Sequence, residues 1–226
     1  MDTDQHSRRA TAVLHGTRLW RSWFLWVTAF EAAGFTFPAL AGVATRDMRQ
    51  GVAYVALVLA GLVEGAALGW SQAHVLSGAI GKLSVHRFTR NTSVAAALAY
   101  AIAMAPTVAG DAVGDWPVGV QIGLGVVFGS ALLASIGTAQ WLELRRSLLH
   151  SASWILTTGG SWLVGLGLFF AIATPLWHEG QATALTVVIG VAAGLVMAAS
   201  VAALTGLAAL WLLRHTTTPA TTVPVT

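Results

Sequence analysis

The sequence predicts an all-α integral membrane protein with six transmembrane helices, arranged as three pseudo-repeated helical hairpins. The chain is 56% hydrophobic, only 9% of its residues are charged, and the charged residues lie between long apolar stretches. A soluble domain carries roughly a quarter charged residues. The net charge of +3 does not indicate a nucleic-acid partner, because the basic residues lie at the ends of apolar segments, where a membrane accounts for them. The expected partner is the lipid bilayer.

Each apolar stretch is long enough to form a transmembrane helix. About 20 apolar residues cross ~30 Å of hydrocarbon, and the chain after Arg90 has four stretches of 20 to 34 residues without Asp, Glu, Lys or Arg. Backbone groups in lipid must bond within their own segment, so each stretch is expected to be helical. The expected spans are residues 20–44, 51–76, 93–110, 117–142, 152–177 and 182–213. The last is long enough to require a tilt.

The distribution of basic residues predicts that both termini are cytoplasmic. With the amino terminus inside, the outer loops hold only Arg46 and Arg49, and the inner segments hold the other ten of the 12 Lys and Arg residues. This is the positive-inside pattern, and it predicts a location in the inner (plasma) membrane. Residues 1–19 then form a cytoplasmic segment before a membrane domain over 20–214. Residues 215–226, rich in threonine and proline, are expected to be a disordered cytoplasmic tail.

Three windows of the sequence repeat a short pattern. They are GWSQAHVLS from Gly69, GTAQWLELR from Gly137 and GLAALWLLR from Gly206, and all three have leucine at the eighth position. The repeat predicts hairpins at about 20–80, 90–146 and 152–214, related by a rough pseudo-threefold axis. Chance similarity among helices rich in glycine, alanine and leucine is the alternative interpretation.

Small residues four positions apart also recur in the second helix of each hairpin. They lie on one helix face, where they let two backbones approach closely in lipid. In the second hairpin Leu133 interrupts the series. The predicted helix-packing residues are Gly61, Gly65, Gly69, Gly129, Gly137 and Gly206.

The window from Gly137 to Arg145, GTAQWLELR, is the clearest copy of the repeated block. In this feature the chain resembles a group of small bacterial multi-pass membrane proteins with recurring G-x-x-Q-W-x-x-L-R blocks. The resemblance extends over most of the chain. It implies the architecture and carries no site residue across.

Two acidic residues, Glu31 and Glu64, fall inside predicted spans, and both belong to the first hairpin. Placing a charged residue in hydrocarbon costs roughly 2.5–3.5 kcal/mol on insertion scales, so such residues are functional candidates by default. If the two carboxyl groups face each other, at least one is expected to carry a proton at neutral pH. They are therefore the candidate catalytic or proton-binding groups. A neutral glutamic acid that only bridges helices by a hydrogen bond is the alternative.

The positions aligned with these carboxylates differ between hairpins. Glu31 aligns with Tyr100 in the second hairpin and Trp162 in the third, and Glu64 aligns with apolar residues. A group needed only to build a hairpin would recur, so the difference favours a functional role. The candidate ligand-pocket residues are Tyr100, Trp162, Gln72 and Gln140. The two glutamines occupy the same repeat position, which also favours a structural hydrogen bond near the inner boundary.

Several classes of site have no matching pattern. There is no cysteine, phosphate-binding glycine loop, H-E-x-x-H, G-x-S-x-G or EF-hand sequence. Scattered histidines near the inner ends and an acidic outer loop are better explained by solvation and the charge rule than by metal binding. We therefore predict no metal and no cofactor.

Three functional hypotheses remain. The first is a proton-linked carrier or binding protein for a small or lipophilic molecule, based on the carboxyl groups within the spans and the repeat architecture. The second is an intramembrane enzyme that uses a glutamic acid as general acid on a lipid or isoprenoid substrate. The third is a non-catalytic subunit that packs against a partner membrane protein through glycine and alanine faces.

Overall fold

The computed structural model describes residues 2–109, 114 and 116–215, with side chains from Gly16 onward. Six α-helices make up this part of the chain, and it contains no strand. Their bounds are α1 Asp2–Thr45, α2 Gln50–Ser77, α3 Val85–Ala109, α5 Val118–Leu144, α6 Ser153–Leu176 and α7 Thr183–Arg214. All six are long and apolar enough to cross a membrane, so the protein is an all-α multi-pass membrane protein.

The helix ends match the predicted spans to within a few residues at most positions. The first span is the part of α1 from Gly16 to Thr45, and α1 also includes most of the predicted cytoplasmic segment 1–19. The helix of the third span is longer than the predicted span, because α3 begins at Val85 and the predicted span begins at residue 93. The side-chain oxygen of Ser84 accepts a hydrogen bond from the backbone N of Arg87, which is the bonding of a helix N-cap. The early turns of α3 are polar, and hydropathy therefore missed them.

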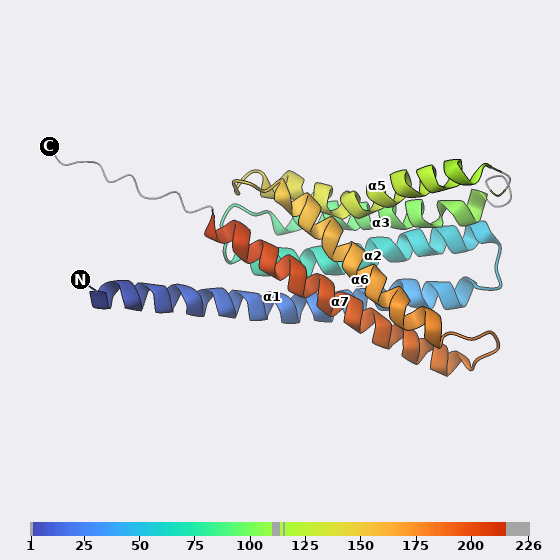
Figure 1. Cartoon of the computed structure of the whole chain (residues 1–226), viewed down its shortest axis with the longest axis horizontal. Helices are drawn as coiled ribbons and strands as arrows, with labels where there is room; N and C mark the ends of the chain where they lie inside the picture. The colour runs from blue at the N-terminus through green and yellow to red at the C-terminus, as the bar shows by residue number, and fades with distance from the viewer. Residues whose placement is uncertain (1, 110–113, 115, 216–226) are drawn as a thin grey trace.

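The helices form a closed ring. Each helix packs against the next in the order α1, α2, α3, α5, α6, α7, and α7 packs back against α1. The helix pairing is consistent with three hairpins, α1–α2, α3–α5 and α6–α7. The helices run roughly alongside one another, with α6 and α7 tilted across the bundle (Figure 1).

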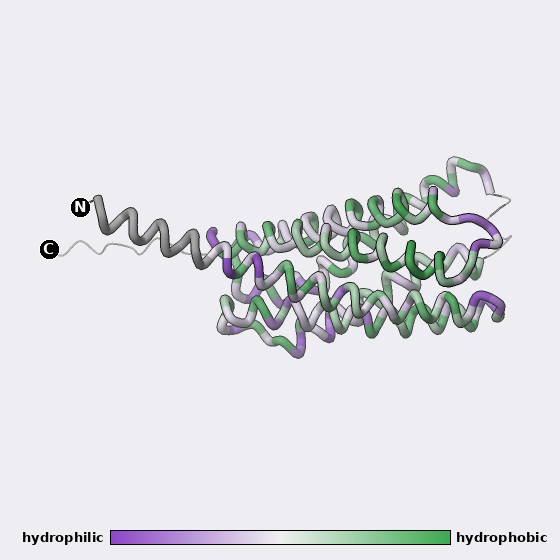
Figure 2. Tube along the Cα trace, turned by 90° about the horizontal axis from the view of Figure 1, so that it is seen from below, coloured by the Kyte–Doolittle hydropathy of each residue, from purple (hydrophilic) through white to green (hydrophobic). Residues whose placement is uncertain are grey.

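The bundle has two distinct ends. At the terminal end, α1 enters the bundle, α7 ends, and residues 78–84 and 145–152 connect neighbouring helices. The opposite end holds the other three connections, among them residues 46–49 and 177–182. Apolar residues predominate along the middle of the bundle, and hydrophilic residues gather toward its ends (Figure 2). The predicted tail from residue 216 onward lies outside the described residues, as do Asp111 and Asp115 of the predicted acidic outer loop.

The three repeat glycines hold consecutive hairpins together. A Cβ atom at Gly69 would lie 2.7 Å from Thr92 Cβ in α3, and one at Gly206 would lie 2.8 Å from the Trp23 ring in α1. A Cβ atom at Gly137 would lie 2.9 Å from Ile155 Cα in α6. Each glycine therefore brings the second helix of one hairpin against the first helix of another.

The remaining predicted packing glycines divide into two groups. Gly61 and Gly65 face α3 so closely that a Cβ atom would overlap the Tyr100 ring at Gly61 and would lie 2.5 Å from Ala96 Cβ at Gly65. Gly129 on α5 differs from the prediction. No described atom outside its own helix turn lies within 4 Å of its Cβ position, so it makes no close helix contact in the described structure. Gly119, Gly123 and Gly125 of α5 also have open space at their Cβ positions, so this half of the helix has no close neighbour among the described residues on its glycine face.

Candidate functional site

A cavity of about 300 Å³ lies inside the ring, and all six helices contribute to its wall. Its volume is at the lower limit for small-molecule binding pockets. The wall is overwhelmingly apolar, with leucine, alanine, phenylalanine and methionine side chains. The sequence-predicted residues Glu31, Glu64, Tyr100 and Trp162 all line it.

The two glutamic acids meet at one side of this cavity. Glu31 in α1 is 0% exposed and Glu64 in α2 is 4% exposed, and the two carboxyl groups lie close enough to interact electrostatically. Gly34, one helix turn after Glu31, makes this approach feasible, because its Cβ position lies only 3.1 Å from Glu64 Cα. A larger residue there would separate α1 from α2. The tertiary structure thus brings the two carboxyl groups together.

Tyr100 joins α3 to the same group. Its hydroxyl donates a 2.7 Å hydrogen bond to Oε2 of Glu64. The Tyr100 ring lies against Gly61 of α2, where no side chain competes for the space. This packing fixes both the ring and the hydroxyl, so one carboxyl group of the pair is held by a defined donor.

Glu31 has no such donor. Within the described part of the chain, no N–H or hydroxyl group donates to either buried carboxyl oxygen of Glu31, and its polar neighbour is the Glu64 carboxyl group, with which it can share a proton. The indole nitrogen of Trp162, which also belongs to the cavity wall, has no partner among described residues. An unbonded buried polar group is costly. Such groups beside a cavity are suited to bonding a ligand or a proton.

The two glutamines predicted as ligand-pocket residues, Gln72 and Gln140, lie outside the cavity. They bond directly to each other, with Gln140 Nε2 donating to Gln72 Oε1 at 2.6 Å. Gln140 Nε2 is also 3.2 Å from Thr92 Oγ1, and Gln140 Oε1 accepts a 2.7 Å hydrogen bond from the Trp154 indole. All four side chains are buried.

The glutamine cluster is part of a layer of buried side chains that closes the ring between the cavity and the terminal end of the bundle. Trp23 packs edge-on against Trp154 and donates a 3.2 Å hydrogen bond to Thr205 Oγ1. With these two residues, all six helices contribute a side chain to the layer. Trp23 precedes Glu31 by eight residues, or about 12 Å along α1, on the terminal side. The cavity is therefore separated from the terminal end.

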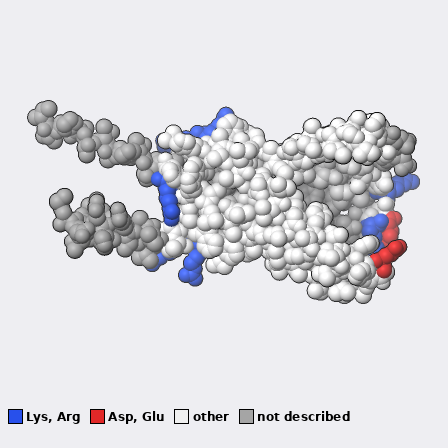
Figure 3. Space-filling view, in the orientation of Figure 1, with Lys and Arg blue, Asp and Glu red and all other residues white. Residues whose placement is uncertain are grey.

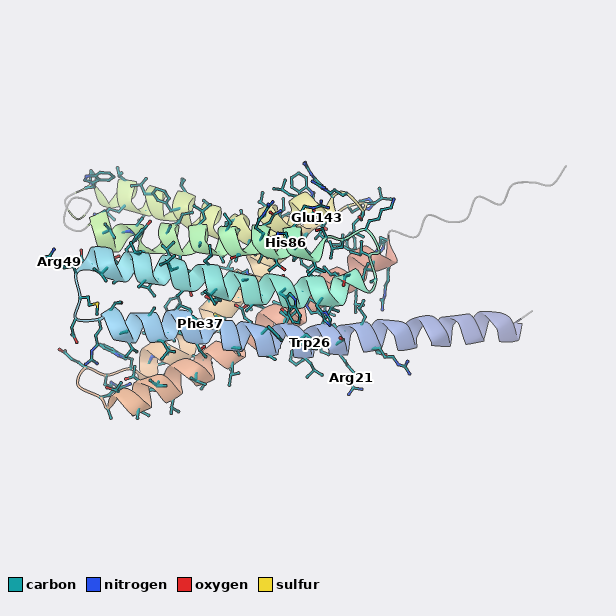
Figure 4. The ribbon with its side chains drawn as sticks, turned by 180° about the vertical axis from the view of Figure 1, so that it is seen from behind. Arg21, Trp26, Phe37, Arg49, His86 and Glu143 are labelled. Atoms are coloured by element: carbon teal, nitrogen blue, oxygen red, sulfur yellow. The ribbon has the colours of Figure 1, made fainter. Side chains whose placement is uncertain are left out.

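An ion pair lies beyond this layer and was not predicted from the sequence. Glu143 of α5 is 2% exposed on its side chain and accepts hydrogen bonds of 3.0 Å from both Nε and Nη2 of Arg87. It also accepts a 3.1 Å hydrogen bond from the backbone N of Ser84. The available signal was an acidic residue two positions before a pair of arginines. Glu143 and His86 lie at this end, and Arg49 lies at the other (Figure 4).

The cavity is not enclosed on the α5–α6 side. Close contact between these helices extends to Gly159, whose Cβ position is 3.1 Å from the backbone oxygen of Leu133. Farther toward the opposite end, the glycines of α5 have open space around them, and Phe170 of α6, a cavity-lining residue, is 59% exposed. The surface is deeply hollowed in the half of the molecule away from the terminal end (Figure 3). The opening faces sideways, toward the region that lipid occupies.

No group of three or more His, Asp or Glu residues in the described ranges could hold a metal ion. No protein-family model matches the sequence, and comparisons with curated proteins and with solved structures found no match. The cavity and its two carboxyl groups are therefore the candidate site.

Proposed function

We propose that this protein binds a small lipophilic molecule in the cavity between its six helices, and that binding is linked to a proton at the Glu31–Glu64 pair. The observation that carries this proposal is the position of two buried carboxyl groups in the wall of an otherwise apolar cavity. The apolar wall suits an apolar ligand body. The carboxyl groups, at least one of which carries a proton when the cavity is empty, supply the linkage.

The lateral opening supports a route from the bilayer. A lipophilic molecule concentrates in the membrane, and the gap between α5 and α6 lets it reach the cavity without crossing an aqueous end. A carrier must also open the closed side, where the Gln72–Gln140 layer blocks the path. If that layer stays closed, the protein is a membrane binding protein; if it opens, the protein is a proton-linked carrier.

We place both termini in the cytoplasm, in the plasma membrane of a bacterial cell. Positive charge gathers at the terminal end in the view of Figure 3, whereas the opposite end shows both signs. The α1–α2 connection at that opposite end contains the Arg46–Asp47 ion pair. On this orientation the closed layer lies toward the cytoplasm and the lateral opening lies in the outer half of the bilayer.

An intramembrane enzyme is the second candidate. It is favoured by one specific observation, the Tyr100–Glu64 hydrogen bond beside Trp162 in a single cavity. A protonated glutamic acid there would act as the general acid on a lipid or isoprenoid, and the aromatic rings would stabilise a developing positive charge.

The test uses purified full-length protein in phosphatidylcholine nanodiscs. A photoactivatable decyl probe carrying a diazirine is prepared as the neutral alcohol and as the primary amine, and labelled residues are mapped by mass spectrometry. We expect saturable labelling of cavity-lining residues by at least one form, with an affinity that changes with pH. Unsaturable labelling confined to lipid-facing residues would overturn the proposal.

Two matched variants of α3 test the location. Ala103 lines the cavity and Ala105 does not, and both are exposed. Ala103→Trp fills the cavity and should abolish most saturable labelling, whereas Ala105→Trp should leave it unchanged. Glu31→Gln and Glu64→Gln then separate the two functions. Loss of pH dependence in binding favours the carrier or binding protein, and loss of lipid turnover with intact binding favours the enzyme.

A further inference from the structure

The only side chains of the described cavity wall that can carry a charge at neutral pH are acidic. Among the described residues in its wall, the titratable side chains are Glu31 from α1, Glu64 from α2 and Tyr100 from α3. The wall contributed by α5, α6 and α7 contains no titratable side chain, and no Lys, Arg or His lines the cavity in the described structure. Nothing in the wall would neutralise an anionic ligand, and two carboxyl groups would repel it.

Only one of the two carboxyl groups has a fixed donor. The Tyr100 hydroxyl donates to Glu64, whereas no N–H or hydroxyl group of the described residues donates to Glu31, whose polar neighbour is the Glu64 carboxyl group. Glu31 belongs to the cavity wall and is 0% exposed, so its carboxylate form lacks the solvation that bulk water gives. A carboxylate in that position needs a counter-charge, which a proton or a bound cation can supply.

Aromatic rings surround the same space. Phe35, Tyr100, Trp162 and Phe170 line the cavity from α1, α3 and α6. The faces of such rings attract cations, and aromatic walls combined with a carboxylate are the usual means of binding an organic ammonium group. The rings also supply apolar surface for the rest of the ligand.

We propose that the ligand is a lipophilic organic cation, an amine with an apolar body, whose ammonium group pairs with Glu31 in exchange for one proton. The ammonium takes the place of the Glu31 proton, which leaves for bulk water, so the cavity gains one positive charge and loses one. This inference rests on the proposed function and specifies its ligand. It makes the carboxyl pair a site that holds either a proton or an amine.

The test compares four decyl compounds in nanodiscs of zwitterionic phosphatidylcholine, so that the membrane itself does not attract cations. The compounds are the primary amine, the trimethylammonium, the alcohol and the carboxylic acid. An ion pair with Glu31, together with contact to the aromatic rings, should make the two cations bind about tenfold more tightly than the alcohol, or better. The acid should bind more weakly than the alcohol. In weakly buffered solution, the trimethylammonium compound should release about one proton for each molecule bound.

Two variants test whether Glu31 is the group that exchanges its proton for the ammonium group. Glu31→Gln should remove both the preference for cations and the proton release, while the alcohol still binds. Glu179→Gln, in the exposed α6–α7 connection, removes a carboxylate of the same type outside the cavity and should change neither. The proton count needs only the wild-type protein, so the proposal remains testable if Glu31→Gln does not fold.

The outcomes separate this inference from the proposed function. Saturable binding of the alcohol and the cations with equal affinity and no proton release would overturn the inference and leave the proposed function intact. A preference for the acid, or a preference for cations that persists in Glu31→Gln, would also overturn the inference. Absence of saturable binding by all four compounds would overturn both.

Discussion

Gln140 donates a 2.6 Å hydrogen bond to Gln72, a residue at the same position of another repeat window and on another helix. The bond joins α5 to α2 across the interior of the ring. Gln140 also bonds Thr92 and Trp154, so a single amide connects four helices. The closed side of the cavity depends on this amide.

Replacing Gln140 should therefore destabilise the bundle. Gln140→Leu leaves the Gln72 carbonyl and the Trp154 indole unbonded in the interior, and we expect a loss of about 2 kcal/mol in the free energy of unfolding. The measurement is unfolding in a titration with denaturing detergent. Ser135→Ala, which removes a hydroxyl bonded only within α5, is the control. Stability equal to wild type would contradict the assigned role. In the double variant with Gln72→Leu, the loss should be smaller than the sum of the two single losses.

The contrast between Gly65 and Gly129 gives a second prediction. Gly65→Ala places a methyl group 2.9 Å from the backbone of α3 at Ser93 Cα, so the helices must separate. We expect a loss of about 1–3 kcal/mol in stability. Gly129→Ala adds the same methyl group in open space and should leave the stability within about 1 kcal/mol of wild type, or raise it through helix propensity. The measurement is thermal unfolding of the two variants under the same conditions. Equal losses of stability would show that α5 is packed at Gly129.

The Arg87–Glu143 pair should make stability depend on salt. Glu143 is buried while the Arg87 side chain is 45% exposed, so the attraction between them is partly screened by solvent. Arg87→Ala leaves Glu143 with Arg146 at 3.7 Å and should lower the thermal midpoint. The difference from wild type should shrink as the salt concentration rises. Arg90→Ala, an exposed arginine one turn further along α3, should have little effect. A difference that does not depend on salt would indicate packing and not charge.

The proposed orientation is testable because the chain has no cysteine. Gly81→Cys places a thiol in the exposed α2–α3 connection, and Glu179→Cys places one in the exposed α6–α7 connection. A maleimide reagent that cannot cross membranes should label Glu179→Cys in intact cells and Gly81→Cys only after the cells are permeabilised. The reverse pattern would place both termini outside. Wild-type protein should not be labelled under either condition.

Much of the fold could be predicted from the sequence, because a membrane imposes a strong local rule. Twenty apolar residues must form a helix in lipid, so hydropathy located the six spans. The same rule did not locate the start of α3 at Val85, since a helix can begin in a polar segment with a Ser84 cap before its apolar stretch begins. It also gave no information on Glu143, whose burial depends on an arginine 56 residues earlier.

The sequence by itself determined that the protein has six membrane-crossing helices and that two carboxyl groups, Glu31 and Glu64, lie within them. Only the tertiary structure decided that these groups share one cavity with Tyr100, that the two glutamines bond to each other outside it, and that α5 separates from α6 beside it. The physical reason is that span formation depends on residues within one segment. Which faces meet depends instead on small residues such as Gly34 and Gly61, whose effect is set by the neighbouring helix.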